Sequence, residues 1–430
     1  MQSLLFGCSL SASCPGEWVD FDTPYDACTT TSHKTGQRMK LVFSDEFESD
    51  GRMFRDGEDA RWTALDHAPY TNHQVNYYNS SMAQTRSGKL QLHFSSDDAT
   101  YTAGDGSVQH RHFQSAMLQT WNKFCMSSGV VEISALLPGR HDQAGLWPAF
   151  WMFGNLGRAT LPASTDGLWP WTYEACASSN ISSPAAAAED ACVANSCTLQ
   201  RISACDANPG FGLHPYQGRG APELDVIEVM PGSGTSAYEG DSKYTDCKAA
   251  TPAERAAASY SRPLMSTSII MAPGIPTDAD QRPTTGCLAD AASEWYPQLS
   301  HHHGAFYGDS PPAEGLTVTA NYEYYGDEFG SKQFWGGGDS RSYSARLQTD
   351  AFSANTGLGE THFNSQHVYR LEWRGGGSGF ARWSLDGATL FEVSQRTLEQ
   401  RRDISFGGRA AGGVGPRTLP TEPMVRSTQY

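Results

Sequence analysis

The sequence has no long hydrophobic run and relatively few basic residues, and both deficits narrow the classes of protein it can belong to. No stretch approaches the roughly 18 apolar residues of a membrane-spanning helix, so we expect no membrane span in this chain. Lysine and arginine number 31 against 47 aspartates and glutamates, which gives a formal net charge of −16. A surface of that sign repels polyanions, so we expect no nucleic-acid partner.

Long helical periods and internal repeats are also missing, which argues against a helical bundle, a solenoid or a propeller. Turn-forming residues are abundant: 43 glycines and 23 prolines separate short runs rich in Val, Ile, Tyr, Phe and Trp. This pattern predicts an all-β, antiparallel two-sheet jelly-roll sandwich with long loop insertions. The strands are expected at 40–43, 77–82, 88–94, 129–137, 145–154, 223–230, 266–271, 316–325, 367–373 and 381–391, with a hairpin turn at 385–388.

The ten cysteines include no C-x-x-C pair, which disfavours a zinc site and favours disulfides formed in an oxidising compartment. Four of them (Cys176, Cys192, Cys197 and Cys205) fall in one loop-like stretch. Glycosylation sequons at Asn79 and Asn180 fit the same compartment. We therefore expect the secretory pathway, the cell surface or an endomembrane lumen, although 1–12 contain no basic residue and show no export signal.

The sequence predicts neither a metal nor a cofactor. His301, His302 and His303 are consecutive and cannot easily converge on one ion, so we interpret them as a polar loop.

The domain organisation expected from composition is simple. Residues 1–38 are rich in Cys and Thr without a clear period and are interpreted as a leader segment, and 39–430 as one domain. Within that domain, 156–219 and 232–261 are expected to be loop-rich insertions.

The most informative stretch is 223–230, in which three acids are interleaved with core-type residues. In a plain strand Glu223 and Asp225 share one face and Glu228 lies on the other. A β-bulge between Asp225 and Glu228 resets the alternation and brings all three carboxyls to one face. The alternative, an acidic strand facing solvent, conflicts with the core-type flanking residues.

Carboxyls this close together cannot all stay ionised, and glycoside cleavage exploits that conflict. A retaining enzyme needs an ionised nucleophile and a protonated acid about 5–5.5 Å apart. We assign Glu223 as nucleophile, Glu228 as acid/base and Asp225 as the residue that orients the nucleophile. The 11 Trp and 18 Tyr could supply flat apolar faces on which sugars stack, although any one of them could equally be core.

The motif 223–228 resembles the bulged catalytic motif of glycoside hydrolase family 16. The surroundings resemble its β-glucan-synthesis-associated branch, which acts in fungal β-1,6-glucan assembly. The matching segments extend from about residue 40 to 424 and are 121–125, 129–139, 145–151, 154–158, 169–173, 218–222, 272–274, 306–308 and 369–373.

The resemblance implies a concanavalin A-like fold with the acids in a concave cleft and a β-glucan polysaccharide as partner. It implies a retaining glycosidase or transglycosylase acting on β-1,3/β-1,6-glucan in glucan synthesis or cell-wall remodelling. The candidate substrate-binding residues are Trp147, Trp151, Trp121, Asn76, Tyr78 and Arg140; the first two are expected to share one face of a strand.

The chain departs from the branch in two respects, and these keep alternatives open. Members usually carry a membrane span before the catalytic domain and continue beyond the segment matching 420–424, so the closing strands are expected to be missing here. The alternatives are a catalytically inactive glucan-binding protein, which would not need the three acids, and a structural cell-surface protein, which would explain none of the motif positions. Linkage specificity, disulfide pairing and oligomeric state are not readable from the sequence.

Overall fold

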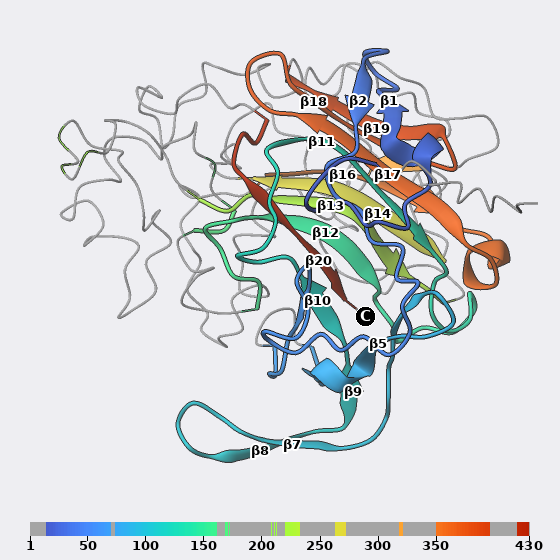
Figure 1. The fold of residues 1–430 in the computed structure, drawn as a ribbon. Helices are drawn as coiled ribbons and strands as arrows, with labels where there is room; N and C mark the ends of the chain where they lie inside the picture. Colours follow the sequence, from blue (N-terminus) through green and yellow to red (C-terminus); the bar gives the residue numbers. More distant parts are fainter. Residues whose placement is uncertain are drawn as a thin grey trace, which may run out of the picture.

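The larger part of the fold is an antiparallel sandwich of two β-sheets (Figure 1). The computed structural model describes residues 14–69, 74–160, 168–170, 172, 208, 210, 212, 220–232, 263–271, 318–320, 350–395 and 419–429. The predicted all-β class is confirmed: the helices among these residues are short 3-10 turns, η1 (Tyr25–Cys28), η2 (Ser80–Met82) and η5 (Glu360–Phe363). None of them is long and apolar enough to cross a membrane.

The larger sheet contains eight antiparallel strands among the described residues. In spatial order they are β15 (Val318–Ala320), β16 (Asp350–Gly357), β14 (Leu264–Met271), β13 (Glu223–Met230), β12 (Ala149–Gly154), β20 (Met424–Gln429), β10 (Met117–Gln119) and β3 (Thr63–Ala64). The acidic strand β13 thus pairs with β14 along its whole length and with β12 from Glu223 to Glu228, so its register is fixed on both sides.

The second sheet has four antiparallel strands in the order β11 (Ser128–Ala135), β17 (His367–Arg374), β18 (Phe380–Leu385) and β19 (Ala388–Ser394). The predicted hairpin turn is present between β18 and β19. Its two central residues, Asp386 and Gly387, have φ values of 48° and 82°, the left-handed backbone that a tight two-residue turn requires.

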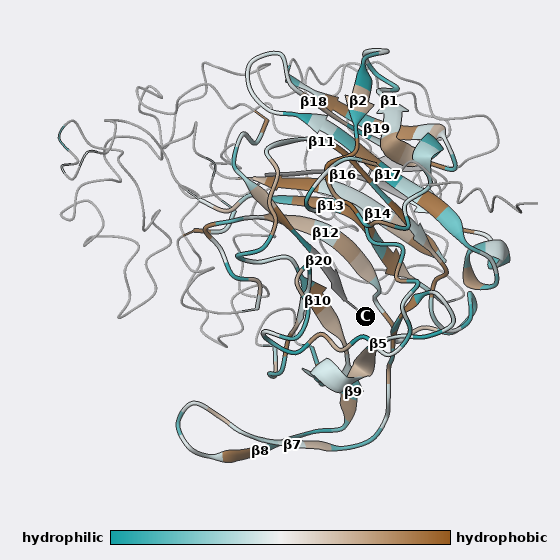
Figure 2. Cartoon of the chain, viewed as in Figure 1, coloured by the Kyte–Doolittle hydropathy of each residue, from teal (hydrophilic) through white to brown (hydrophobic). Residues whose placement is uncertain are grey.

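The core lies between the two sheets, where alternate residues of each strand meet. Leu224, Val226 and Ile227 of β13 pack with Leu371 of β17 and Trp383 of β18 in one buried cluster. Hydrophobic residues accordingly lie mainly along the strands in Figure 2, while the peripheral loops are mostly pale or teal. Filling this side of β13 with apolar residues leaves its other side for polar ones.

The predicted absence of closing strands needs correction, because the residues that follow Pro423 enter the larger sheet. Strand β20 pairs with β12 along its whole length and with β10 at its far end. It therefore occupies an interior position of the sheet, as the dark red strand in Figure 1 shows. On the side of β10, Thr120 and Met126 also hydrogen-bond to the backbone of Arg426 and Met424.

One side chain of β20 is unusual, because Arg426 is buried and has no carboxylate partner among the residues that the structure describes. Its guanidinium lies 4.3 Å from the ring centroid of Phe43 and 5.3 Å from that of Phe124. Its Nε has no hydrogen-bond partner among the described residues, and burial lowers the pKa of Arg426 to about 10. Two cation–π contacts offset part of the desolvation cost of this charge.

The outer face of the second sheet carries a ladder of paired charges. Arg370 on β17 contacts Glu132 of β11 at 2.7 Å, and Arg382 on β18 contacts the fully buried Glu392 of β19 at 2.5 Å. Glu372 of β17 lies opposite Arg382. Cross-strand pairs of opposite sign on one face stabilise a sheet.

A hairpin from the amino-terminal part of the chain covers this ladder. It consists of β1 (Thr29–Thr31) and β2 (Arg38–Lys40). In the intervening turn, Ser32 donates to Glu372, and the Lys34 ammonium lies 2.5 Å from the carboxylate of Glu392. The segment 1–38 was predicted to be a leader; from residue 14 onward it instead packs on the domain, because its polar side chains complete the charge pairs of the sheet.

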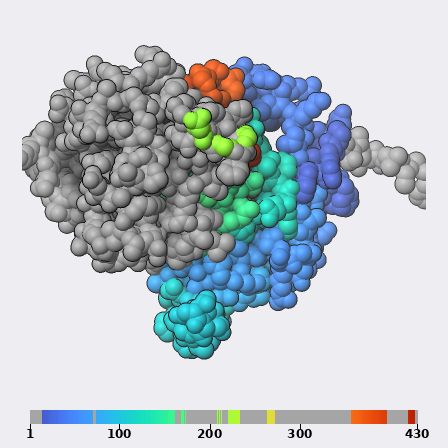
Figure 3. Space-filling view, turned by 90° about the vertical axis from the view of Figure 1, so that its left-hand side faces the viewer, coloured from blue at the N-terminus to red at the C-terminus, as the bar shows by residue number. Residues whose placement is uncertain are grey.

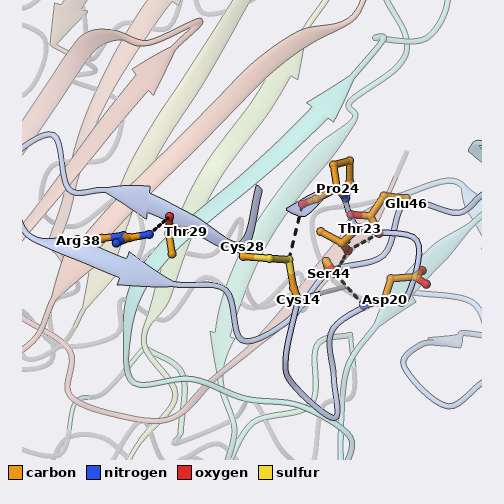
Figure 4. Close-up of a disulfide and its surroundings, with 9 residues drawn as sticks. All are labelled: Cys14, Asp20, Thr23, Pro24, Cys28, Thr29, Arg38, Ser44 and Glu46. Atoms are coloured by element: carbon orange, nitrogen blue, oxygen red, sulfur yellow. Dashed lines mark hydrogen bonds between the residues drawn. A yellow bond between two sulfur atoms is a disulfide. The ribbon is translucent and has the colours of Figure 1, made fainter. Parts of the chain in front are cut away.

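A disulfide joins Cys14 to Cys28 at the base of this hairpin (Figure 4). Their Cα atoms are 5.2 Å apart, and the bridge closes a loop of 14 residues. Inside the loop, the Thr23 hydroxyl donates to Glu46, so the loop is also tied to the following segment. The disulfide expected from composition is confirmed for this pair. Cys125 is a free, exposed thiol, and the other seven cysteines lie outside the described residues.

Three two-stranded ladders flank the larger sheet: β4 (Asn76–Tyr78) with β9 (Phe113–Ser115), β5 (Ala83–Thr85) with β6 (Leu90–Leu92), and β7 (Ala99–Thr102) with β8 (Val108–Arg111). The β7–β8 hairpin projects from the body of the protein as the pale blue knob at the bottom of Figure 3.

Some predicted strand boundaries are wrong for identifiable reasons. The strand predicted at 77–82 is divided, because the Asn79 side chain accepts from the Ser81 amide and caps the 3-10 turn η2. The strand predicted at 145–154 begins at Ala149, because Gly139 and Gly145 adopt positive φ in the preceding loop and Pro148 lacks an amide proton. The strand expected at 316–325 is described only at 318–320. The four clustered cysteines, the Asn180 sequon, the histidines at 301–303 and most of both insertions lie outside the described residues.

Candidate active site

The predicted bulge in β13 is confirmed by the pairing on both sides of the strand. Asp225 lies opposite Ser268 of β14, and Glu228 lies opposite Ser266. Two residues of β13 therefore span the space of one residue of β14. On the other side, Asp225 pairs with Trp151 and the register shifts before the next pair.

The bulge places both Val226 and Ile227 in the core between the sheets. A hydrogen bond from the second sheet also ends at this point: the indole N–H of Trp383, which is fully buried, donates to the backbone carbonyl of Asp225 at 2.7 Å. The carboxyls of Glu223, Asp225 and Glu228 consequently lie together on the opposite face, where they interact with one another electrostatically.

Glu223 is partly buried, and its carboxyl receives a hydrogen bond from the indole N–H of Trp169 at 2.5 Å. Burial and the nearby charge of Glu228 raise the pKa of Glu223 to about 8, while hydrogen bonds from Trp169 and Asp225 act in the opposite direction. The two hydrogen bonds favour the anionic form of Glu223, whereas burial and Glu228 favour its protonated form.

Asp225 is buried between the two glutamates. Burial, and then the charge of Glu223, raise the pKa of Asp225 well above its ordinary value. Ser268 donates to its Oδ2, whereas its Oδ1 would have no partner among the described residues if every carboxyl were ionised. Asp225 also forms a side-chain hydrogen bond with Glu223 that lowers the pKa of Glu223 and raises that of Asp225, as expected when Asp225 carries the proton.

Glu228 has a different environment. Burial, and then the charge of Asp225, raise the pKa of Glu228 well above its ordinary value. Its hydrogen-bond donor is the indole N–H of Trp147, at 3.3 Å from Oε1. This hydrogen bond is longer than the one from Trp169 to Glu223. Because the pKa of Glu228 is raised well above its ordinary value, the protonated form of Glu228 is favoured.

The three environments divide the roles that retaining cleavage requires. Glu223 has two donors and is the carboxyl that most readily carries the negative charge. The protonated form of Glu228 is favoured by burial and by the charge of Asp225. One ionised and one protonated carboxyl on the same face is the arrangement that a nucleophile and a general acid need. The roles assigned from the sequence remain predictions.

The two tryptophans predicted to bind substrate both lie beside the acids, although only Trp151 belongs to β12. Trp147 precedes that strand and is 40% exposed, so its ring is accessible to a ligand. Trp151 is the cross-strand neighbour of Asp225 and is 8% exposed; its Nε1 has no hydrogen-bond partner among the described residues. Trp147 is the more accessible of the two stacking surfaces.

The other predicted substrate contacts are placed less favourably. The Arg158 guanidinium lies 4.4 Å from the ring centroid of Trp121 and covers that face of the ring. Arg140 is exposed and forms an ion pair with Asp142 at 2.7 Å. Neither residue has a described contact with the three acids.

Asn76 and Tyr78 need correction, because both are buried. Asn76 donates to Ser115 of β9 at 2.9 Å. Tyr78 is fully inaccessible, and its hydroxyl donates to Gln74 at 2.6 Å. The two residues support the side of the larger sheet that carries the acids, and Tyr78 cannot contact a sugar directly.

Sequence reasoning missed three residues that contact the acidic strand: Trp169, Ser268 and Trp383. Trp169 belongs to a motif noted only for its family resemblance, and 54 residues separate it from Glu223. Ser268 could have been found, since the consecutive hydroxyl residues Ser266, Thr267 and Ser268 interrupt an otherwise apolar strand. Nothing local in the sequence distinguishes Trp383 from an ordinary core tryptophan.

Comparison with protein families gives one match, over residues 8–246, to the family described as "Beta-glucan synthesis-associated protein SKN1/KRE6/Sbg1". The beta-glucan synthesis-associated protein KRE6 of Saccharomyces cerevisiae is 40% identical over 215 residues, which are 49% of this chain and 27% of that protein. SKN1 of Candida albicans is 37% identical over 218 residues, again 49% of this chain and 27% of the relative. The chain thus matches about a quarter of the length of these relatives.

Among solved structures, similarity is found to endo-β-1,3-glucanases. That of Pyrococcus furiosus has 13% identity and a TM-score of 0.39, covering 94% of this chain and 97% of the other. The catalytic domain of the laminarinase from Thermotoga petrophila has 13% identity and a TM-score of 0.38, covering 91% and 94%. At these values the likeness carries no argument about activity.

The family match extends over more than half of the chain and includes the acidic strand, with its bulge and its three carboxyls. This chain therefore belongs to the SKN1/KRE6/Sbg1 family of beta-glucan synthesis-associated proteins.

Proposed function

We propose that this chain is a retaining glycosidase or transglycosylase that acts on β-1,3- or β-1,6-linked glucan in β-glucan synthesis or cell-wall remodelling. The observation that carries the proposal is the placement of Glu223, Asp225 and Glu228 on one face of a bulged strand, each with different hydrogen-bond donors. The names of the relatives support the link to β-glucan synthesis.

The reaction follows from the protonation states. Ionised Glu223 attacks the anomeric carbon, and protonated Glu228 gives its proton to the glycosidic oxygen as that bond breaks. The product is a glycosyl ester of Glu223 with Glu228 now ionised. Glu228 then removes a proton from water or from a sugar hydroxyl, which attacks the anomeric carbon and releases Glu223.

Hydrolysis and transglycosylation share the covalent intermediate and differ only in the group that attacks it. The role in glucan synthesis favours a sugar acceptor, and the accessible Trp147 ring beside Glu228 offers a surface on which such an acceptor could stack. We also propose that the protein functions in the secretory pathway or at the cell surface, which the Cys14–Cys28 disulfide supports.

The experiment that tests the proposal is incubation of the purified chain with a β-1,3-gluco-oligosaccharide or a β-1,6-gluco-oligosaccharide, followed by mass spectrometry of the products. Shorter sugars alone indicate hydrolysis, and longer or branched sugars indicate transglycosylation. Glu223→Ala should abolish turnover while sparing binding, whereas Asp105→Asn in the β7–β8 turn, away from the acids, should leave it unchanged. Binding without turnover by the wild-type protein would instead indicate a glucan-binding protein.

A further inference from the structure

Two indole N–H groups approach the acidic strand, one at each end of the carboxyl cluster. Trp169 donates to Oε2 of Glu223 at 2.5 Å, and Trp147 donates to Oε1 of Glu228 at 3.3 Å. Each candidate catalytic carboxyl thus has its own tryptophan donor. The two bonds differ in length, and the two rings differ in exposure.

The Trp169 side chain is 7% exposed and packs in a buried cluster with Trp151 and Phe153 of β12. Such packing restricts the ring, so that its N–H points at a fixed place. Trp147 is 40% exposed and precedes its strand, so fewer contacts restrict its ring. The donor at Glu223 is therefore the more rigid one.

The surroundings of Glu223 make this donor important. Among the described residues, the charged groups that face Glu223 are Asp225 and Glu228, both from its own strand and both acidic. The residues opposite Glu223 on the neighbouring strands are Phe153 and Ile270, which carry no charge. No described cation is present to stabilise a negative charge on Glu223, so the described stabilisation comes from hydrogen-bond donors.

We propose that Trp169 is a positioning residue whose N–H favours the ionised form of the Glu223 carboxyl and aims it for attack, while Trp147 is the weaker counterpart that acts on Glu228. The inference rests on the proposed function for its catalytic meaning. Its physical content, which is the control of each carboxyl by its own indole, can be measured without turnover. A hydrogen bond to a charged group strongly favours the ionised form in a poorly hydrated site.

The test compares Trp169→Phe with Trp147→Phe, since each removes one N–H donor and keeps an aromatic ring. The carboxyl carbons are labelled with ¹³C-glutamate, the signals are assigned with Glu223→Gln and Glu228→Gln, and each carboxyl is titrated by NMR. Trp169→Phe should raise the titration midpoint of Glu223 by about one pH unit or more, a tenfold change in its ionisation constant. Trp147→Phe should leave the titration midpoint of Glu223 unchanged and raise that of Glu228. Equal midpoints for Glu223 in the wild type and Trp169→Phe would overturn the inference.

A second measurement needs no variant of Trp169. In the wild-type protein the Nε1–H resonance of Trp169 should move with pH at the midpoint of Glu223, and this movement should vanish in Glu223→Gln. A Trp169 resonance that ignores the ionisation of Glu223 would also overturn the inference.

The kinetic consequence separates this inference from the proposed function. If the chain turns over glucan, Trp169→Phe should shift the acidic limb of the kcat/KM profile upward by the same amount as the NMR midpoint. Coupled titrations without any turnover would leave the inference standing and remove the proposed function. If the protein turns over glucan and the acidic limb of its kcat/KM profile is the same in the wild type and Trp169→Phe, the proposed function stands and the inference about Trp169 fails.

Discussion

The acid cluster should make the stability of this protein fall as the pH rises, and Glu223→Gln should remove part of that fall. Folding raises the pKa of Glu223 from 4.5 to about 8, mainly because the carboxyl is buried. Between these values the folded protein holds a proton that the unfolded chain has released. The contribution of Glu223 to the free energy of unfolding is therefore largest below pH 4.5 and decreases as the pH rises through this window.

The magnitude follows from the width of the window. One proton held only in the folded state changes the free energy of unfolding by about 1.4 kcal/mol per pH unit. Over the window from 4.5 to about 8 this amounts to about 5 kcal/mol for Glu223 alone. Asp225 and Glu228, whose pKa values are also raised, add to the fall in the same direction. Glutamine at 223 keeps the size of the side chain and removes the titration.

The assay is urea unfolding of the wild type and Glu223→Gln at pH 5, 6 and 7. The wild type should lose about 1.4 kcal/mol per pH unit more than the variant, which corresponds to one proton. Asp105→Asn is the control, because that exposed carboxyl has a lowered pKa and is ionised in both states over this range. Parallel pH dependences in the wild type and Glu223→Gln would refute the reasoning, since they would mean that Glu223 keeps an ordinary pKa.

The other predictions concern stability and are each measurable by urea unfolding. Arg426→Met should raise the free energy of unfolding by about 1–4 kcal/mol, because it replaces a buried charge, for which the described residues offer no carboxylate partner, with an apolar side chain of similar length; a loss of stability would show that the cation–π contacts outweigh desolvation. Glu392→Gln should lower the free energy of unfolding by about 3–5 kcal/mol, since it breaks the ion pairs of Glu392 with Lys34 and with Arg382; an unchanged urea midpoint would contradict this. Cys14→Ser should cost about 3 kcal/mol by freeing the loop to Cys28; reduced wild-type protein should match it, and a difference between the two would count against the loop-closure explanation. Trp383→Phe should cost about 1–3 kcal/mol by leaving the carbonyl at the bulge without its donor, and wild-type stability would show that this bond does not hold the bulge.

The parts of the fold that could be predicted are those with a local signal. The acidic strand has the bounds expected, 223–230, because its core residues alternate with acids on either side of one irregularity. The β18–β19 turn was predictable because Asp-Gly supplies the left-handed backbone that a two-residue turn needs. Such features depend on a few neighbouring residues and are visible without a structure.

The parts that failed depend on partners far away in the chain. The polar segment around Ser32 resembles a leader until its contact with Glu372, 340 residues later, is known. Tyr78 resembles a sugar-binding aromatic because exposure cannot be read from residue type. Trp169 went unassigned because its distance from Glu223 in the sequence hides a direct hydrogen bond.

In the candidate site, too, features with a local sequence signal could be predicted and features that depend on distant residues could not. The three acids and their shared face could be derived from strand periodicity and a bulge. The sequence could not show which carboxyl most readily ionises, because that depends on hydrogen-bond donors from other segments, namely Trp169, Trp147 and Ser268. The sequence therefore predicts the groups that carry the chemistry, and the tertiary structure supplies their protonation states.

The central claim, that Glu223 is the nucleophile of a retaining reaction, is tested most directly by trapping the glycosyl-enzyme. The purified chain would be incubated with a 2-deoxy-2-fluoro-β-glucosyl donor that carries a good leaving group, digested and examined by mass spectrometry. The account predicts a mass increase of one fluoroglycosyl unit on the peptide containing Glu223, and none in Glu223→Gln. A label on Glu228 or elsewhere, or glucan turnover that inverts the anomeric configuration, would contradict it.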